Sequence, residues 1–383
     1  MWKRAIEKSV QRYLHSKKNK ILFIWGPRRS GKTTILTKIS KDQKVPIFNF
    51  DLLSDRELFQ PKKDVLERLT KKTKLILIDE IQNYPESTLA LKILSDVFKV
   101  KIIATGSSEL RQKSNEFDSL AGRYEELFCL PFSAEEIVLN SKVEEYEKKA
   151  FTEKIADEFQ TYGSYPEIYL SKSLEAEKIN LLKTILEGYL LKDIINIYSL
   201  KNSKLAIDIL TKIALQLGSE VSLREIANSL SANVSTVSSY IEIFIKNYVL
   251  ISLPSFKTNL RRAVSENRKL YFYDLGIRNF LIRDFRPLDL RPDRGGVFEN
   301  FIIAEMVKKR LIDNIPINFY FYREYGGKEV DIVIEDYKRR YMAVEIKNNK
   351  NGNVNVFPLP HRSEQINKEN YYSKINKYIF WGK

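Results

Sequence analysis

The stretch Ile21–Thr34, ILFIWGPRRSGKTT, decides the fold of the first part of the chain. Five apolar residues, Ile21–Trp25, are enough for a buried strand, and the pattern then breaks into Gly26–Thr33. That octapeptide reads G-x-x-x-x-G-K-T, the Walker A phosphate loop, which stands between a strand and a helix. The backbone N–H groups of such a loop and the positive end of the following helix hold an anion. The stretch therefore predicts a nucleoside triphosphate site.

The residue types of this loop suit the phosphates and Mg²⁺ of a nucleotide. Lys32 would reach the β- and γ-phosphates, and the Thr33 hydroxyl would bind Mg²⁺. Arg28 and Arg29 would contact phosphate or remain solvated, and the loop leaves both alternatives open. We expect ATP and Mg²⁺ as cofactors. The predicted nucleotide-binding residues are Gly26, Pro27, Arg28, Arg29, Ser30, Gly31, Lys32, Thr33 and Thr34.

A second apolar stretch, Lys74–Ile78, ends in two acids, Asp79 and Glu80, which form a Walker B element. Asp79 would hold Mg²⁺, and Glu80 would orient and polarise the attacking water. The alternative is a pair of surface acids that close a strand. Because this acidic pair follows a phosphate loop, it indicates that the site hydrolyses the nucleotide and does not only bind it.

Two further positions are candidates for contact with the γ-phosphate. Strand Lys101–Thr105 leads into Thr-Gly-Ser-Ser, where the hydroxyl of Ser107, or else that of Thr105, would lie between the two Walker elements. Arg123 precedes the strand Glu125–Leu130 and would stabilise charge on the nucleotide of its own chain or of a neighbour. A plain turn and a surface arginine are the alternatives. The alternation of strands and helices predicts a parallel sheet covered on both faces.

The middle of the chain reads as helical. Ser133 and Glu136 form a capping box, and the helical pattern that follows is interrupted at Tyr162–Pro166. We interpret the segment up to about Leu200 as a helical lid closing on the nucleotide.

A winged helix-turn-helix is predicted next. It comprises helices Leu205–Leu217, Ser222–Leu230 and Ser235–Asn247 and strands Val249–Phe256 and Leu270–Asp274. Such a fold contacts nucleic acid through its recognition helix and wing, or serves only as a packing module. The candidate contact residues are Ser235, Thr236, Ser238, Ser239 and, in the loop between the wing strands, Arg261, Arg262, Arg268 and Lys269.

The last third carries an acidic constellation. Glu299 lies on a predicted helix, Asp331 lies on an apolar strand, and a later strand ends in Glu345-Ile-Lys347. Three carboxylates would bind a divalent metal, and Lys347 would activate water or offset charge on the phosphate. The alternative is a charge-alternating edge strand. This order predicts a Mg²⁺ nuclease-like site, although fold and activity are separate claims.

The net charge of the chain indicates which kinds of partner it could bind. The net charge of +15 suits a polyanion, with nucleic acid (DNA) first and an anionic membrane surface second, and a merely soluble basic protein is the alternative. The single cysteine, Cys129, excludes a disulfide within the chain, and His15 and His361 are too far apart in sequence to suggest a metal cluster. No segment is apolar enough to span a membrane, so we expect a cytoplasmic protein with no membrane insertion.

The chain resembles the AAA (STAND-related) ATPases of archaea and bacteria. These join a P-loop domain to a winged helix and a C-terminal restriction-endonuclease-like, PD-(D/E)xK domain. The motifs that carry this resemblance are GPRRSGKTT, LILIDEIQ, TGSS, LAGR followed by LPFS, YGSYPE, KLYFYDLG, and EVDIVIE with AVEIK. The resemblance implies ATPase activity and a nuclease-like fold around Glu299, Asp331, Glu345 and Lys347. It also implies that the arginine completing the site can come from a neighbouring subunit, which makes a homo-oligomer possible.

The expected fold is therefore an α/β parallel-sheet P-loop NTPase of the ASCE/AAA type, followed by three further domains. The predicted divisions are 1–132 for the ATPase core, 133–203 for the lid, 204–280 for the winged helix and 281–383 for the restriction-endonuclease-like domain. The expected function is Mg²⁺-dependent ATP hydrolysis coupled to DNA binding or processing, as in a nucleotide-gated nuclease. The alternative is an ATP-driven switch whose C-terminal domain binds a partner without cutting.

Overall fold

The computed structural model describes residues 2–71, 73–107, 117, 119–171, 174–191, 202–257, 268–324, 327–347 and 356–378. The chain forms two compact units, Met1–Leu130 and Pro131–Lys383. The division falls two residues before the one predicted between the ATPase core and the lid. Each unit is described separately below.

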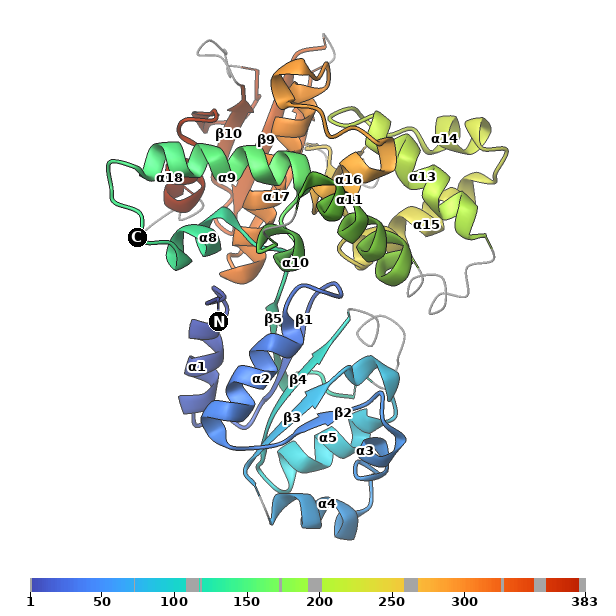
Figure 1. Cartoon of the computed structure of the whole chain (residues 1–383), viewed down its shortest axis with the longest axis vertical. Coiled ribbons are helices and arrows are strands. Elements are labelled where there is room, and N and C mark those ends of the chain that lie inside the picture. The colour runs from blue at the N-terminus through green and yellow to red at the C-terminus, as the bar shows by residue number, and fades with distance from the viewer. Residues whose placement is uncertain are drawn as a thin grey trace. The chain divides into compact units, whose positions relative to one another are not determined.

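The N-terminal unit is built on a five-stranded parallel sheet, ordered β2-β3-β4-β1-β5. Nearly every residue of β1, β3 and β4 is buried, so these strands are covered on both faces, as predicted. Figure 1 shows β4 lying between β3 and β1. The strands are β1 (Ile21–Trp25), β2 (Ile47–Asn49), β3 (Leu75–Asp79), β4 (Lys101–Gly106) and β5 (Tyr124–Phe128).

Helices connect these strands. The Walker A loop leads directly into α2, and a 3₁₀ turn follows Walker B. The helix that was expected directly after the phosphate loop is present as α2. The helical elements are α1 (Glu7–His15), α2 (Lys32–Gln43), α3 (Leu53–Glu57), α4 (Lys63–Thr70), η1 (Ile81–Asn83) and α5 (Ser87–Asp96).

The C-terminal unit combines helices with two small sheets. One sheet is the antiparallel pair β6 (Leu250–Pro254) and β7 (Arg268–Phe272). The other is ordered β11-β10-β9-β8 and comprises β8 (Ile317–Arg323), β9 (Glu329–Asp336), β10 (Tyr341–Ile346) and β11 (His361–Ile366). The helices are α8 (Ala134–Asn140), α9 (Lys148–Tyr162), α10 (Pro166–Tyr169), α11 (Glu175–Lys183), the π-helical η2 (Thr184–Leu191), α13 (Ser203–Leu215), α14 (Leu223–Ser229), α15 (Val234–Lys246), α16 (Leu275–Ile282), the 3₁₀ turn η4 (Leu288–Leu290), α17 (Arg294–Ile312) and α18 (Tyr371–Tyr378).

The predicted capping box at the start of α8 is present. The Ser133 side chain accepts from the Glu136 backbone N–H, and the Glu136 carboxylate accepts from the Ser133 backbone N–H at 3.1 Å.

The segments predicted as lid and winged helix share one hydrophobic core. Leu182 and Ile185 pack in the same cluster as Ile213, Phe244 and Phe272. Helix α16, which was not predicted, packs against both α9 and α13. The predicted division at 203/204 therefore separates segments that are buried together.

The wing strands are joined to the neighbouring sheet and helix. Beyond β6, the Phe256 backbone N–H donates to the Phe321 carbonyl of β8 at 2.6 Å. On β7, the Phe272 backbone N–H donates to the Asn300 side-chain oxygen of α17, and the Asn300 amide donates back to the Phe272 carbonyl, both at 2.8 Å. Asn300 thus supplies β7 with the pair of bonds that a neighbouring strand would supply.

This attachment corrects one sequence prediction. Arg268 and Lys269 were expected in the loop between the wing strands, but both lie on β7. Arg268 pairs with Glu242 of α15 at 2.5 Å, and Lys269 is buried. Neither is placed for contact with a nucleic-acid groove, and Arg261 and Arg262 lie outside the described residues.

Candidate nucleotide site and C-terminal carboxylate cluster

The two glycines of the Walker A loop are required by its backbone. Gly31 has a φ of 100° and precedes the first residue of α2, a conformation that L side chains rarely adopt. At Gly26 a Cβ atom would lie 1.9 Å from the Cys129 carbonyl oxygen, because β1 and β5 run side by side there. The loop therefore approaches the neighbouring strand too closely for any other residue.

Lys32 lies within the curl of the loop. Its Nζ donates to the Gly26 and Pro27 carbonyls, both at 2.9 Å, and the side chain is buried. Burial lowers its pKa, while the nearby Glu80 and Asp79 carboxylates oppose that shift. An ammonium bonded to backbone carbonyls, beside a helix N-terminus, is suited to binding a phosphate group.

Oxygen ligands converge on Asp79 at the end of β3. The Thr33 hydroxyl donates to Asp79 Oδ2 at 2.8 Å, and the Thr105 hydroxyl donates to Asp79 Oδ1. A carboxylate and hydroxyls fit a Mg²⁺ ion that keeps several of its own waters. Because β4 lies between β1 and β3, the end of β4 meets both Walker elements, as predicted. Thr105, the second choice from sequence, is the residue that bonds to Asp79.

Gln82 links Glu80 to Ser107. The Gln82 amide donates to Glu80 Oε2, and its side-chain oxygen accepts from the Ser107 backbone N–H at 3.1 Å. Glu80 itself has a φ of 55°, an uncommon conformation for a non-glycine residue. The Ser107 hydroxyl is buried and has no hydrogen-bond partner among the described residues. Gln82 belongs to the LILIDEIQ motif, but the sequence alone did not predict a role for it.

Arg123 lies at the other end of the sheet. Its backbone carbonyl accepts from Ile21 at the start of β1, and its Nε bonds Asp96 Oδ2 at 2.9 Å. β1 runs from Ile21 to Trp25 at about 3.3 Å per residue, so the Walker A loop begins about 17 Å away. Arg123 therefore lies far along the sheet from the phosphate loop of its own chain, and its role at a nucleotide stays a prediction.

The remaining loop residues differ in exposure. Ser30 is buried, and its hydroxyl donates to the Pro27 carbonyl at 2.8 Å. Arg29 and Thr34 are exposed, and Arg28 is half-buried. Arg29 also has a positive φ of 62°. Ser30 and Lys32 thus bond to carbonyl groups of the loop itself, whereas Arg29 and Thr34 are exposed.

The C-terminal unit brings Glu299 together with cationic and hydroxyl groups. Glu299 Oε1 receives the Lys269 ammonium at 3.3 Å and the Tyr271 hydroxyl, both from β7. Lys269 also pairs with Glu329 of β9. Burial and the adjacent Glu329 raise the pKa of Glu299, while Lys269 and Tyr271 lower it, and the net shift is upward.

The other predicted site residues lie on adjacent strands. Asp331 Oδ2 accepts from the Ile346 backbone N–H at 2.7 Å, and Lys347 Nζ pairs with Glu345 Oε1 at 2.5 Å. Burial, reinforced by repulsion from Glu299 and Glu345, raises the pKa of Asp331 to about 7. The acids are thus within electrostatic range of one another. No three His, Cys, Asp or Glu side chains in the described parts of the chain, however, are grouped so that they could hold a metal ion.

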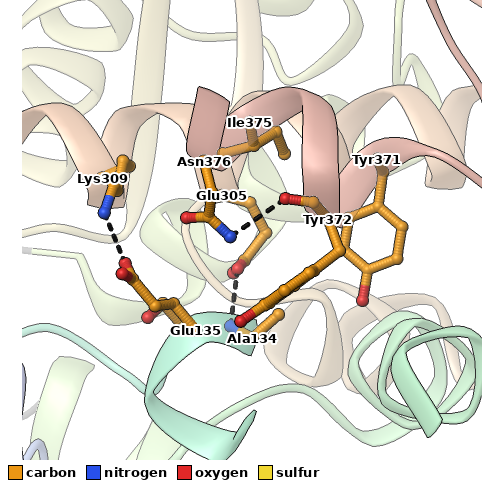
Figure 2. A pocket seen from close by; sticks show the side chains of 9 residues that line it. Ala134, Glu135, Glu305, Lys309, Tyr371, Tyr372, Ile375 and Asn376 are labelled. Atoms are coloured by element: carbon orange, nitrogen blue, oxygen red, sulfur yellow. Dashed lines mark hydrogen bonds and ion pairs between the residues drawn. The ribbon is translucent and has the colours of Figure 1, made fainter. Parts of the chain in front are cut away.

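A separate pocket lies where α8, α17 and α18 meet. Figure 2 shows Lys309 paired with Glu135 at 2.6 Å and Glu305 accepting from the Ala134 backbone N–H at 2.7 Å. Behind them, Lys308 donates to Glu305, to the Phe132 carbonyl and to the Ser164 hydroxyl, at 2.9–3.0 Å. These bonds fix the first residues of the unit to α17. The pocket is lined by Ser133, Ala134, Glu135, Glu305, Lys309, Tyr371, Tyr372, Ile375 and Asn376.

Comparison with known families agrees with the nucleotide site. Residues 18–138 match the AAA domain family, residues 153–288 match a domain of unknown function (DUF8612), and residues 294–362 match another (DUF4143). The chain therefore carries a P-loop AAA domain followed by these two domains. An AAA domain implies ATP binding, typically with Mg²⁺. Among the described residues, no helix is long and apolar enough to cross a bilayer.

Similar whole proteins carry no assigned activity. The chain is 29% identical to the uncharacterized protein MJ1544 of Methanocaldococcus jannaschii over 82% of its own length and 72% of that protein's. It is 24% identical to MJ1637 of the same organism, over 72% of its own length and 65% of that protein's. A Haemophilus influenzae protein, also uncharacterized, is 23% identical over 68% of this chain and 69% of its own.

Solved structures give only low similarity scores. The Holliday junction branch migration motor RuvB of Thermotoga maritima has 16% identity and a TM-score of 0.30, covering 65% of this chain and 89% of that one. The Aeropyrum pernix ORC1 protein in complex with DNA has 14% identity and a TM-score of 0.29, covering 73% and 91%. The assignment of the N-terminal unit depends on its own geometry and on the AAA domain match.

Proposed function

We propose that the N-terminal unit is a Mg²⁺-dependent ATPase. The observation that carries this proposal is the convergence of Lys32, Thr33, Asp79 and Thr105 at the carboxyl ends of β1, β3 and β4. In open α/β sheets this edge is where ligands bind. Mg²⁺ bound there would neutralise charge on the phosphates.

Each residue of the nucleotide site would have a distinct role in ATP binding or hydrolysis. Lys32 would exchange its two carbonyl partners for phosphate oxygens, and Thr33 with Asp79 would hold Mg²⁺. Glu80, held by Gln82, would orient the attacking water and accept its proton.

Two substitutions test the ATPase. Lys32→Ala should reduce turnover to background and weaken ATP binding. Glu80→Gln should keep ATP binding and lower turnover by about 10²- to 10⁴-fold, the usual range for loss of a general base. If Lys32→Ala hydrolyses ATP as fast as the wild type, the assignment of Gly26–Thr33 as a phosphate-binding loop is wrong.

We further propose that Arg123, if it is catalytic, acts on the nucleotide of a neighbouring subunit. Its position at the amino end of β5 supports only this version. Mixing Arg123→Ala with Glu80→Gln chains should then restore part of the activity that each lacks alone. If the mixture remains inactive, Arg123 does not act on the nucleotide of a neighbouring subunit, and its role is the ion pair with Asp96.

For the C-terminal unit, we propose that ATP turnover controls its binding to nucleic acid. The exposed Ser235 and Ser239 on α15 support DNA as the partner, and the net charge of +15 of the whole chain suits a polyanion. Ser235→Glu should weaken duplex DNA binding measured by fluorescence anisotropy, because it sets a negative charge against the phosphates. The new carboxylate near the start of α15 favours the helix, so the variant should fold.

Cleavage of the bound DNA is the finer version of this proposal. The pairing of Lys347 with Glu345, next to Asp331, supports it. Wild type and Asp331→Ala would be compared on duplex and branched DNA with Mg²⁺. Equal cleavage by both, or none by either, would eliminate the nuclease.

The alternative, a switch that binds a partner without cutting, has its own support. Glu299 is engaged by Lys269 and Tyr271 rather than directed at the other acids. ATP turnover without detectable affinity for any nucleic acid would favour a protein partner.

A further inference from the structure

Arg4, near the start of the chain, contacts the phosphate loop of the N-terminal unit. Its side chain is buried, and its Nη1 atom donates to the carbonyl of Ser30, the residue before the second loop glycine. The Nη2 atom of the same guanidinium donates to the Leu130 carbonyl at 2.5 Å. A Cβ atom on Gly31 would lie 3.2 Å from Arg4 Nη1. The loop thus packs directly against a buried guanidinium that also bonds the chain beyond β5.

The backbone of Arg4 is itself held in place. Its N–H donates to Glu7 Oε1 at 2.9 Å, and its carbonyl accepts from the Glu7 N–H at 3.1 Å. Glu7 Oε2 pairs with Lys38 of α2 at 2.5 Å, and α2 is the helix that follows the loop. Because the backbone and the head group of Arg4 are both fixed, little further entropy is lost when the side chain holds the Ser30 carbonyl.

The orientation of the Ser30 carbonyl determines where the Gly31 N–H points. The two groups belong to one planar trans peptide, so they point in opposite directions. With the carbonyl directed at Arg4, the N–H points away from Arg4. Glycine adopts positive and negative φ about equally readily, so this peptide could rotate if nothing held it. A rotated peptide would put a carbonyl oxygen in place of one of the N–H groups with which such loops bind phosphate.

We propose that Arg4 is a positioning residue of the nucleotide site, and that it holds the peptide between Ser30 and Gly31 in the orientation that accepts phosphate. This inference rests on the proposed ATPase function. Arg4 acts through the Ser30 carbonyl and not on the nucleotide itself. The apparent Kd of a site is its intrinsic Kd divided by the fraction of chains in the binding-competent form, so loss of Arg4 raises the Kd for ATP. Saturating ATP selects the competent form again, so kcat is retained.

The test compares Arg4→Met and Arg4→Lys with the wild-type full chain. Lysine keeps the positive charge but lacks the planar fork that bonds the Ser30 and Leu130 carbonyls. The Kd of a non-hydrolysable ATP analogue should rise about tenfold or more in Arg4→Met, as expected for the loss of a hydrogen bond from a charged group, and by a smaller factor in Arg4→Lys. KM for ATP should rise in parallel, while kcat at saturating ATP stays close to that of the wild type.

Arg12→Met provides the matched control. Arg12 is an exposed arginine of α1 whose guanidinium donates to Ser9 Oγ at 2.8 Å, and its loss should leave Kd and KM unchanged. Thermal melting shows which variants are folded. A wild-type Kd in folded Arg4→Met, or in Arg4→Lys if Arg4→Met does not fold, would overturn the proposal, as would an equal rise in Arg12→Met.

A lower kcat with an unchanged KM would also overturn the proposal, because that is the result expected if Arg4 only stabilises the fold and fewer chains are active. Absence of analogue binding by the wild type would instead overturn the ATPase proposal, and this inference with it.

Discussion

Replacing Gln82 should slow ATP turnover without weakening ATP binding. Gln82→Met keeps a side chain of similar length but removes the amide that donates to Glu80 Oε2 and accepts from the Ser107 N–H. A hydrogen bond to a charged group contributes about 1.5–3 kcal/mol. If that amount is lost from the positioning of Glu80 in the transition state, turnover falls about 10- to 150-fold, at about 1.36 kcal/mol per tenfold.

The binding of ATP should be unchanged, because Lys32 and Thr33 do not contact Gln82 in the described structure. The assay is steady-state turnover, with kcat and KM resolved, together with the Kd of a non-hydrolysable ATP analogue. The effect should appear in kcat and leave Kd unchanged.

Asn83 provides a matched control in the same 3₁₀ turn. Its amide also bonds a carboxylate, Asp51 Oδ1 at 2.6 Å, but that pair is exposed and separate from Glu80. Asn83→Ala should change kcat by less than about fivefold, since exposed polar pairs are worth less than about 1 kcal/mol. Wild-type kcat in Gln82→Met, or an equal loss in Asn83→Ala, would refute the positioning role.

Two further predictions concern the C-terminal unit. Gly163 has a φ of 83°, and an added Cβ would lie 2.1 Å from Asp274 Oδ1. Gly163→Ala should therefore displace the Asp274 carboxylate from the Ser164 backbone N–H. The free energy of unfolding should fall by about 3 kcal/mol or more, which would be measured as a lower melting temperature. A melting temperature equal to that of wild type would contradict the clash. Burial raises the pKa of Glu305, so this carboxyl favours the folded state at pH values below its unfolded pKa of about 4.3, and its contribution is lost as pH rises through the higher folded pKa. The melting temperature of Glu305→Gln relative to wild type should accordingly rise from pH 4 to pH 8, and parallel curves would contradict this sign.

The nucleotide site was predictable in most of its parts because its signals are local. The spacing of Gly26 and Gly31, the lysine after the second glycine, and the acids at the end of an apolar strand each follow from backbone needs within a few residues. The parallel sheet also followed from the alternation of strands and helices. Gln82 was missed because its two partners belong to different strands, and a glutamine after an acidic pair has no signature of its own.

In the C-terminal unit, the sequence predicted helices and strands but not the partners of the buried charges. The helices and strands predicted for the winged helix overlap α13, α14, α15, β6 and β7. The partners of Lys269 were not predicted, because they lie thirty and sixty residues further along the chain (Glu299 and Glu329). A lysine directly before an apolar stretch is read as a solvated wing residue until the packing of β7 is known.

The sequence by itself determined the phosphate loop, the Walker B acids and the parallel-sheet α/β class of the N-terminal unit, since these depend on periodicity and on conformations that only certain residues adopt. The tertiary structure alone decided which charges meet. It placed Arg123 at the far end of its sheet, Gln82 between Glu80 and Ser107, and Lys269 beside Glu299. The physical reason is that a side chain's partner depends on which strands become neighbours, and that order is settled by packing of the whole chain rather than by any local stretch.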